Sequence, residues 1–157
     1  MSIVLQSSGG GSVTLQEPST ASNYTHTLPA ATGEVALTST NGAWTSYTPT
    51  ISAATGTITT ASGTAKYHTI GKTCIVNMNI TITTAGTGNN QLFVTLPFTS
   101  AARIQSGTTG GEFSNTGYMI KGYIPASTTQ LQLTYYNNTT VIASGNLVIV
   151  TTTYEIA

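Results

Sequence analysis

Charged side chains are the first thing that this sequence lacks. The 157 residues include four Lys or Arg, four Glu and no Asp, so charged residues make up 5% of the chain, against about 25% in typical soluble proteins. The formal net charge is zero. Such a chain offers no basic surface to nucleic acid or acidic lipid and no field that steers an ionic ligand. We therefore expect no nucleic-acid or membrane partner, and a neutral surface that favours association between copies of the chain.

Cysteine and long apolar runs are also scarce. The single cysteine, Cys74, excludes an internal disulfide and a cysteine-based zinc site. Its place in an alternating pattern predicts a small buried apolar side chain. No apolar run approaches the roughly 18 residues of a membrane-spanning helix, and no basic stretch followed by an apolar core marks a signal peptide. The sequence thus predicts neither a membrane span nor a cleaved leader.

The groups that usually perform catalysis are few and scattered. The glutamates are Glu17, Glu34, Glu112 and Glu155. They lie far apart along the sequence, so the pattern predicts no acid–base pair. His26 and His68 have no Cys or Glu at metal-ligand spacing, although a trimer in which three copies of one His meet on the axis would be an alternative route to a metal site. We expect no enzyme, no cofactor and no metal.

Threonine is abundant instead, at about a fifth of all residues. Its β-branched side chain favours the pleated surface of a sheet, and no apolar stripe recurs at helical spacing. The clearest strand pattern covers residues 74–83. Five apolar side chains alternate along one face of it, namely Cys74, Val76, Met78, Ile80 and Ile82. Alternation with one apolar face is typical of antiparallel sheets, so we predict an all-β protein.

Further strands are predicted at intervals of roughly 8–12 residues. They cover residues 47–51, 57–60, 66–70, 92–96, 117–124, 130–136 and 145–154. The Gly-rich stretch 107–112 is interpreted as a loop, and residues 137–140 as the turn of a hairpin. About eight strands with turns between them predict a jelly-roll-like or other antiparallel β-sandwich, preceded by an extended, intertwined N-terminal β segment.

The first 40 residues differ from the rest. Residues 1–11 combine a short apolar start, MSIVL, with a hinge that contains three consecutive glycines. Residues 12–40 alternate like strands but contain too few apolar residues to fold alone. They therefore need partners, which would be other copies of the chain or a foreign surface, and we expect an interlocked homotrimer to supply them. Its predicted contacts are Val13, Leu15, Tyr24, Leu28, Val35 and Leu37. Residues 41–157 are then the β-sandwich body.

Tyrosine is the enriched side chain best suited to recognition. Four tyrosines fall in the second half of the chain, Tyr118, Tyr123, Tyr135 and Tyr136. With neighbouring Asn and Thr they would form a face that binds a glycan or receptor by ring stacking and neutral hydrogen bonds. The alternative is that these tyrosines fill strand and interface positions.

Several strings of the sequence form longer motifs. Residues 9–37, GGGSVTLQEPSTASNYTHTLPAATGEVAL, combine a strand that ends at proline with a YTHTLPAATG turn. The body contains WTSYTPTIS (44–52), GTAKYHTIGKTCIVNMNITITTAGTG (63–88) and QLFVTLPF (91–98). These strings, about half of the chain, resemble modules of tailed-bacteriophage virion structural proteins. The resemblance implies a trimeric, all-β virion component without catalytic residues.

Two positions on such a particle fit the sequence. A capsid decoration, or cement, protein would be a homotrimer on the capsid exterior that binds the major capsid protein. Its anchoring side chains would be Met1, Ile3, Val4 and Leu5. A short tail or head fibre would instead carry the body as a tip that binds a host-surface glycan or receptor. No repeat or heptad supplies a shaft, so we favour the capsid position.

Two further alternatives lie outside these virion positions. A glycan-degrading spike would need a pair of carboxylates, which the sequence does not bring together. A carbohydrate-binding module of non-viral origin would share the tyrosines and the neutral surface without the trimeric N-terminal segment.

Overall fold

The computed structural model describes residues 2–6, 9–16 and 43–157. The chain divides into two units, Met1–Val35 and Ala36–Ala157. Within the described residues every regular element is a β-strand, and no helix occurs among them. The predicted all-β class is thereby confirmed.

The first unit contains a two-stranded antiparallel sheet. Strand β1 (Ser2–Gln6) pairs with β2 (Ser12–Gln16), with Ile3 opposite Leu15. In the connection Gly10 has a φ of 85°, which glycine adopts without strain. Strand β1 lies in the predicted arm, residues 1–11, and β2 begins the predicted trimerising segment, residues 12–40. The two strands therefore form one sheet across the predicted boundary. Residues 17–40 of that predicted segment lie outside the described residues.

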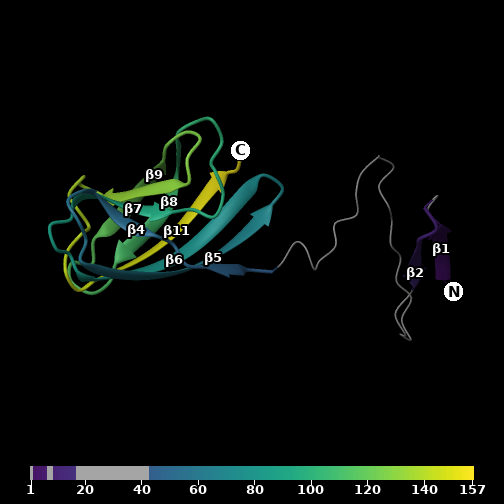
Figure 1. Ribbon diagram of the computed structural model, residues 1–157, viewed down its shortest axis with the longest axis horizontal. Helices are drawn as coiled ribbons and strands as arrows, with labels where there is room; N and C mark the ends of the chain where they lie inside the picture. The colour runs from purple at the N-terminus through teal and green to yellow at the C-terminus, as the bar shows by residue number, and fades with distance from the viewer. Residues whose placement is uncertain (1, 7–8, 17–42) are drawn as a thin grey trace. The chain divides into compact units, whose positions relative to one another are not determined.

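The described part of the second unit, residues 43–157, contains nine strands. They are β3 (Thr45–Tyr47), β4 (Ile51–Thr55), β5 (Thr60–Ile70), β6 (Thr73–Thr84), β7 (Asn89–Thr95), β8 (Gln105–Glu112), β9 (Met119–Ile124), β10 (Gln130–Tyr135) and β11 (Asn146–Glu155). Every pairing is antiparallel. The strands form one sheet in the order β3-β5-β6-β11-β8-β9-β10-β7-β4 (Figure 1).

Short connections curl this sheet around its core. Residues 85–88 join β6 to β7, although four strands separate these two in the sheet. Residues 48–50 likewise join β3 to β4, which are the two edge strands. Because loops this short keep the joined ends close together, strands far apart in the sheet face one another. The hydroxyl of Tyr47 in β3 donates a hydrogen bond to the carbonyl oxygen of Thr95 in β7 (3.2 Å).

The core follows directly from alternation along the strands. In β6 the five predicted apolar side chains are 0–1% exposed, whereas Asn77, Asn79 and Thr81 face solvent. Four other strands alternate in the same way. Their inward side chains join the same cluster and include Leu92, Val94, Ile120, Ile124, Leu131, Leu133, Val148 and Val150. One apolar face per strand therefore produces one core inside the curled sheet.

The prediction of a loop at 107–112 was wrong, because these residues lie in strand β8. Glycine normally weakens a strand, but here it lets β11 come close. A Cβ at Gly107 would overlap the carbonyl oxygen of Thr153, and one at Gly110 that of Ile149. Both carbonyl groups belong to β11, which pairs with β8. The glycines are thus required by the packing of two neighbouring strands.

The predicted hairpin at 137–140 was also wrong. The chain does turn there, and Asn138 has a φ of 68°. However, β10 lies between β9 and β7, whereas β11 lies between β6 and β8. Residues 141–145 cross from one part of the sheet to the other, and their Val141 and Ile142 are buried in the core. Burial of these two side chains stabilises a crossing that the turn composition alone does not reveal.

Two weaker strands were placed inaccurately. The predicted strand 47–51 is interrupted at 48–50, where Pro49 lacks the N–H that a ladder needs. The predicted strand 57–60 is mostly a crossing, since β5 begins at Thr60. The first crossing joins the two edge strands β3 and β4, and the second leads from β4 to β5, which lies beside β3.

Candidate functional site

The structure separates the four tyrosines that the sequence grouped. The ring centroid of Tyr118 lies 5.5 Å from that of Tyr135 and 5.8 Å from that of Tyr136, in both cases edge-to-face. Tyr123 lies near the opposite end of β9, on its outward face. The predicted recognition face therefore corresponds to two separate places.

Only part of the first group is accessible. Tyr118 and Tyr136 are 46% and 59% exposed, whereas Tyr135 is 6% exposed. The Tyr135 hydroxyl forms a hydrogen bond with the hydroxyl of Thr116 (3.2 Å) and accepts one from Nδ2 of Asn146 (3.0 Å). Tyr135 thus holds the interior together, and its two neighbours present rings at the surface.

Tyr135 belongs to a polar network, which we call the Glu112 cluster, and in which Glu112, Tyr135 and Asn146 are buried whereas Asn115 and Thr116 are exposed. It consists of Glu112, Asn115, Thr116, Tyr135 and Asn146. The carboxylate of Glu112 is fully buried. It accepts hydrogen bonds from the backbone N–H groups of Ser114 (2.6 Å), Asn115 (3.0 Å) and Thr116 (2.6 Å), and from the Thr116 hydroxyl (3.0 Å). The turn after β8 thus closes around one carboxylate.

The hydrogen bonds decide the charge of this group. Burial by itself would raise the pKa of Glu112, but the donors from Thr116, Ser114 and Asn115 outweigh it and lower the pKa to about 2. The carboxylate is therefore charged at neutral pH, although solvent does not reach it. A buried carboxylate whose oxygens are occupied by donors of its own turn stabilises the fold and is not a proton-transfer group.

Sequence reasoning missed this cluster. The signal lay in the residues after Glu112, where Ser114, Asn115, Thr116 and Gly117 have a composition typical of tight turns. A lone glutamate immediately before such a turn is positioned to accept its backbone N–H groups.

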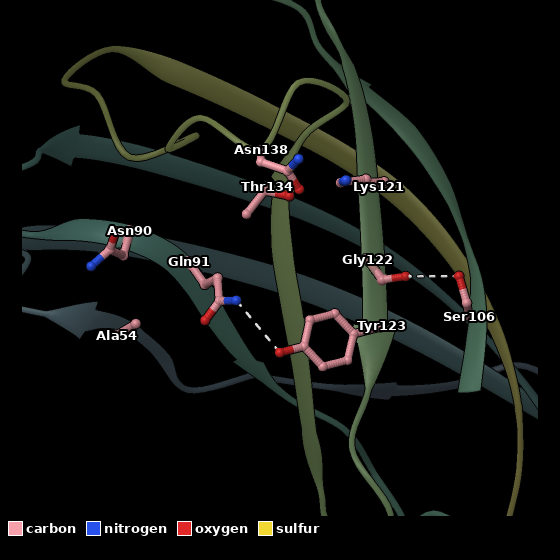
Figure 2. A pocket seen from close by; sticks show the side chains of 9 residues that line it. All are labelled: Ala54, Asn90, Gln91, Ser106, Lys121, Gly122, Tyr123, Thr134 and Asn138. Carbon is pink, nitrogen blue, oxygen red and sulfur yellow. Dashed lines mark hydrogen bonds between the residues drawn. The ribbon is translucent and has the colours of Figure 1, made fainter. Parts of the chain in front are cut away.

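A second polar site is open to solvent. A groove of about 470 Å³ lies on the outward face of β4, β7, β10, β9 and β8, which are neighbours in the sheet (Figure 2). We call it the polar groove. Its side chains include Asn90, Gln91, Lys121, Tyr123, Thr134 and Asn138. Short side chains at Ala54 and Ser106 leave room at two of its sides.

The groove presents hydrogen-bonding groups around one aromatic ring. Tyr123 is 38% exposed, and Nε2 of Gln91 donates a long hydrogen bond to its hydroxyl (3.4 Å). Figure 2 shows the Tyr123 ring standing between Gln91 and the β8 edge of the groove. Lys121 lies directly opposite Thr134 in the β9–β10 ladder. Amides, hydroxyls, a phenol ring and one ammonium group thus share one surface.

Among the described residues, Lys121 is the only charged side chain that lines the polar groove. The two glutamates in the described part of the chain are engaged elsewhere. Glu112 is enclosed in its cluster, and Glu155 pairs with Arg103 (2.7 Å). The groove therefore carries a single positive charge without a carboxylate partner among residues 43–157.

Metal ligands do not gather in the described residues, where no three His, Cys or Glu side chains are placed to hold one ion. His68 lies beside the ring of Trp44, at a centroid distance of 5.9 Å, and His26 lies outside the described residues. Cys74 is buried as predicted, and its burial raises the pKa of the thiol. Within those same residues there is no helix long and apolar enough to cross a membrane.

The predicted N-terminal contacts are only partly covered by the structure. Ile3, Val4 and Leu5 lie in β1, and Val13 and Leu15 lie in β2. Five further predicted residues lie outside the described residues: Met1, Tyr24, Leu28, Val35 and Leu37. Their roles in anchoring and trimer formation remain predictions.

Comparison of the chain with protein-family models, curated proteins and solved structures found no match. Two features of the described residues bear on function, the small β1–β2 sheet and the polar groove.

Proposed function

We propose that this chain is a non-enzymatic structural protein of a tailed-bacteriophage virion. In this proposal a homotrimer decorates the capsid exterior and binds the major capsid protein through its N-terminal region. The low charge of the chain and the resemblance of its motifs to virion modules support the proposal. The structural observation that carries it is the two-stranded sheet of β1 and β2.

This small sheet needs further partners. In the described residues β1 and β2 pair only with each other, so each strand has one edge without a ladder partner. A two-stranded sheet is marginally stable in water, and a free edge accepts an added strand from another chain. A strand of the major capsid protein or of another copy would supply the missing hydrogen bonds. Three tethered copies bind more tightly than one, because each raises the effective concentration of the others.

Deletion of residues 1–11 tests the anchoring role. We expect the shortened protein to remain a trimer by light scattering and to keep the thermal midpoint of its body, because the described body does not include those residues. It should no longer sediment with purified capsids. A shortened protein that still coats capsids would show that the N-terminal region is not the anchor.

The second candidate is a short tail or head fibre with a receptor- or glycan-binding tip, and the polar groove favours it. Gold-labelled antibodies on purified particles separate the two candidates. Label spread over the heads supports decoration, and label confined to the tail supports the fibre. Particles without any label would contradict both virion positions.

We also propose that the curled sheet is the jelly-roll-like or sandwich arrangement that the sequence predicts. The crossings at 48–50 and 85–88 support this, because each joins strands that are distant in the sheet order. Inter-strand distances measured by spin labels on β6 and β7 test it. Label separations too long for facing layers, which pack about 10 Å apart, would exclude a sandwich.

A further inference from the structure

We infer that the polar groove binds an oligosaccharide that carries a carboxylate, with Tyr123 stacking against a sugar ring and Lys121 pairing with the carboxylate. The inference rests on the second candidate function, a glycan-binding body, and it names the site and the class of ligand. It is carried by the composition, shape and charge of the groove.

The composition favours a sugar over an apolar ligand. Sites for drug-like molecules are lined mainly by apolar side chains, whereas this groove is lined by amides, hydroxyls and one phenol ring. Amide groups both donate and accept hydrogen bonds, as sugar hydroxyl groups do. A partly exposed tyrosine adds a flat apolar face with a polar tip. That combination matches the alternating polar edges and apolar faces of a sugar ring.

The shape favours a chain over a single small ligand. The groove, of about 470 Å³, lies within the range of about 300–1,000 Å³ that is typical of ligand sites. It is open to solvent and is lined by residues of five neighbouring strands, which span roughly 19 Å at about 4.8 Å per strand. Several consecutive sugar units fit such a surface.

Tyr123 is better placed for stacking than the other exposed tyrosines. Tyr118 and Tyr136 lie edge-to-face with each other and cover part of their ring surfaces. Within the described chain Tyr123 has no ring partner and is held by the hydrogen bond from Gln91. Its ring therefore keeps a face free for a ligand, while its hydroxyl is fixed in position.

The charge selects an acidic sugar. Lys121 is the one charged side chain of the groove and has no carboxylate partner among residues 43–157. An ammonium group forms its strongest hydrogen bonds with ionised acceptors. A carboxylate on the ligand would pair with Lys121 as the carboxylate of Glu155 pairs with Arg103. Because no carboxylate among residues 43–157 lines the groove, none of these residues repels such a ligand.

An array of oligosaccharides tests the inference with the full-length protein. Oligosaccharides that contain uronic or sialic acid units are printed beside the same compounds with their carboxyl groups methyl-esterified. We expect the protein to bind at least one acid, and to bind its ester about tenfold more weakly, since a charge-assisted hydrogen bond is lost. The preference for the acid should decrease as salt is added.

Matched variants locate the binding. Tyr123→Ala should weaken binding of the acid about tenfold, in keeping with the loss of an aromatic contact. Lys121→Met should remove the difference between acid and ester. Two controls outside the groove, Tyr136→Ala and Lys66→Met, should leave binding unchanged. Thermal midpoints verify folding, and Tyr123→Thr, which suits an exposed strand position, replaces Tyr123→Ala if the latter unfolds.

The outcomes separate this inference from the function on which it rests. If acids bind and both groove variants retain that binding, the groove is not the site, although a glycan-binding body still stands. If esters bind as well as acids, the acidic ligand class is wrong. If no saccharide on the array binds, both the inference and the glycan-binding function fail.

Discussion

The Glu112 cluster and the polar groove are built from similar side chains, which use their hydrogen bonds differently. In the cluster, Asn146 donates to the Tyr135 hydroxyl and to the carbonyl oxygen of Val141, and Asn115 donates to Asn146 (2.7 Å). In the groove, Tyr123 has one long contact and Lys121 has no ion-pair partner within the described chain. Polar side chains that satisfy one another hold a fold together, whereas those left partly unsatisfied at the surface remain available to a ligand.

The largest expected effect is that of Glu112→Gln on stability. The amide would replace one of the two acceptor oxygens by an NH2 group that faces the N–H groups of residues 114–116, so some of these donors would lose their acceptor. We expect the free energy of unfolding to fall by about 3 kcal/mol, measured by urea denaturation. The matched control is Glu155→Gln, whose carboxylate is 42% exposed and whose loss should change stability by less than about 1 kcal/mol. Equal losses of stability for the two substitutions would contradict the assignment of Glu112 as the more strongly stabilising carboxylate.

The pH dependence sharpens the role of Glu112. Its pKa is lowered to about 2 in the folded protein from 4.5, so the stabilisation it provides is fully present above pH 4.5. It is lost as the pH falls through the folded pKa, because the unfolded chain binds the proton more readily. We expect the urea midpoint of the native protein to fall between about pH 4.5 and pH 2. In Glu112→Gln this part of the decrease should be missing, and an unchanged profile would contradict the assignment.

Tyr135 and Tyr136 offer a smaller test on adjacent residues. Tyr135→Phe removes a hydroxyl that forms hydrogen bonds with Asn146 and with the Thr116 hydroxyl. It should lower stability by about 1 kcal/mol. Tyr136→Phe removes a hydroxyl from a side chain that is 59% exposed, and its thermal midpoint should match that of the native protein. A larger loss at Tyr136 than at Tyr135 would contradict the assigned burial.

The smallest expected effect on stability is that of Tyr123→Ala in the groove. Its side chain is partly exposed on the outward face, so removal should change the free energy of unfolding by less than about 0.5 kcal/mol. The same substitution should weaken binding of the acidic oligosaccharide. A variant that loses much stability would show that the ring supports the sheet, as Tyr135 supports the interior.

Much of the fold was predictable because alternation is a local property. The alternating pattern of β6 correctly predicts which side chains from Cys74 to Ile82 are buried, because only one orientation of the strand places its apolar face in the core. Strand β8 was missed because its glycines serve a contact with β11 that is distant in the sequence. The hairpin at 137–140 was predicted wrongly for the same reason. The turn itself depends on local residues, but the strands that pair with β10 and β11 come from distant parts of the sequence.

The candidate site was less predictable than the fold. Tyr123 was predicted to take part in recognition and it lies on the outward face, but the sequence grouped it with Tyr135, which points inward. The polar groove combines residues of five strands, and Gln91 meets Tyr123 only after the sheet order is known. Spacing along the chain carries no information about such a meeting. A burial pattern assigned strand by strand would have separated Tyr135 from Tyr123, because the two lie on opposite faces.

The position of β11 has a consequence for how the chain acquires this fold. Among the described strands it comes last in the sequence, yet it lies between β6 and β8 and joins β3-β5-β6 to β8-β9-β10-β7-β4. Before β11 is in place, β6 and β8 each expose an unpaired edge, which can recruit a strand from a neighbouring molecule. Ladders that join distant segments also form slowly. A polypeptide whose synthesis stops before residue 146 should therefore aggregate. For complete chains, folding should be faster than association between chains only at low protein concentration.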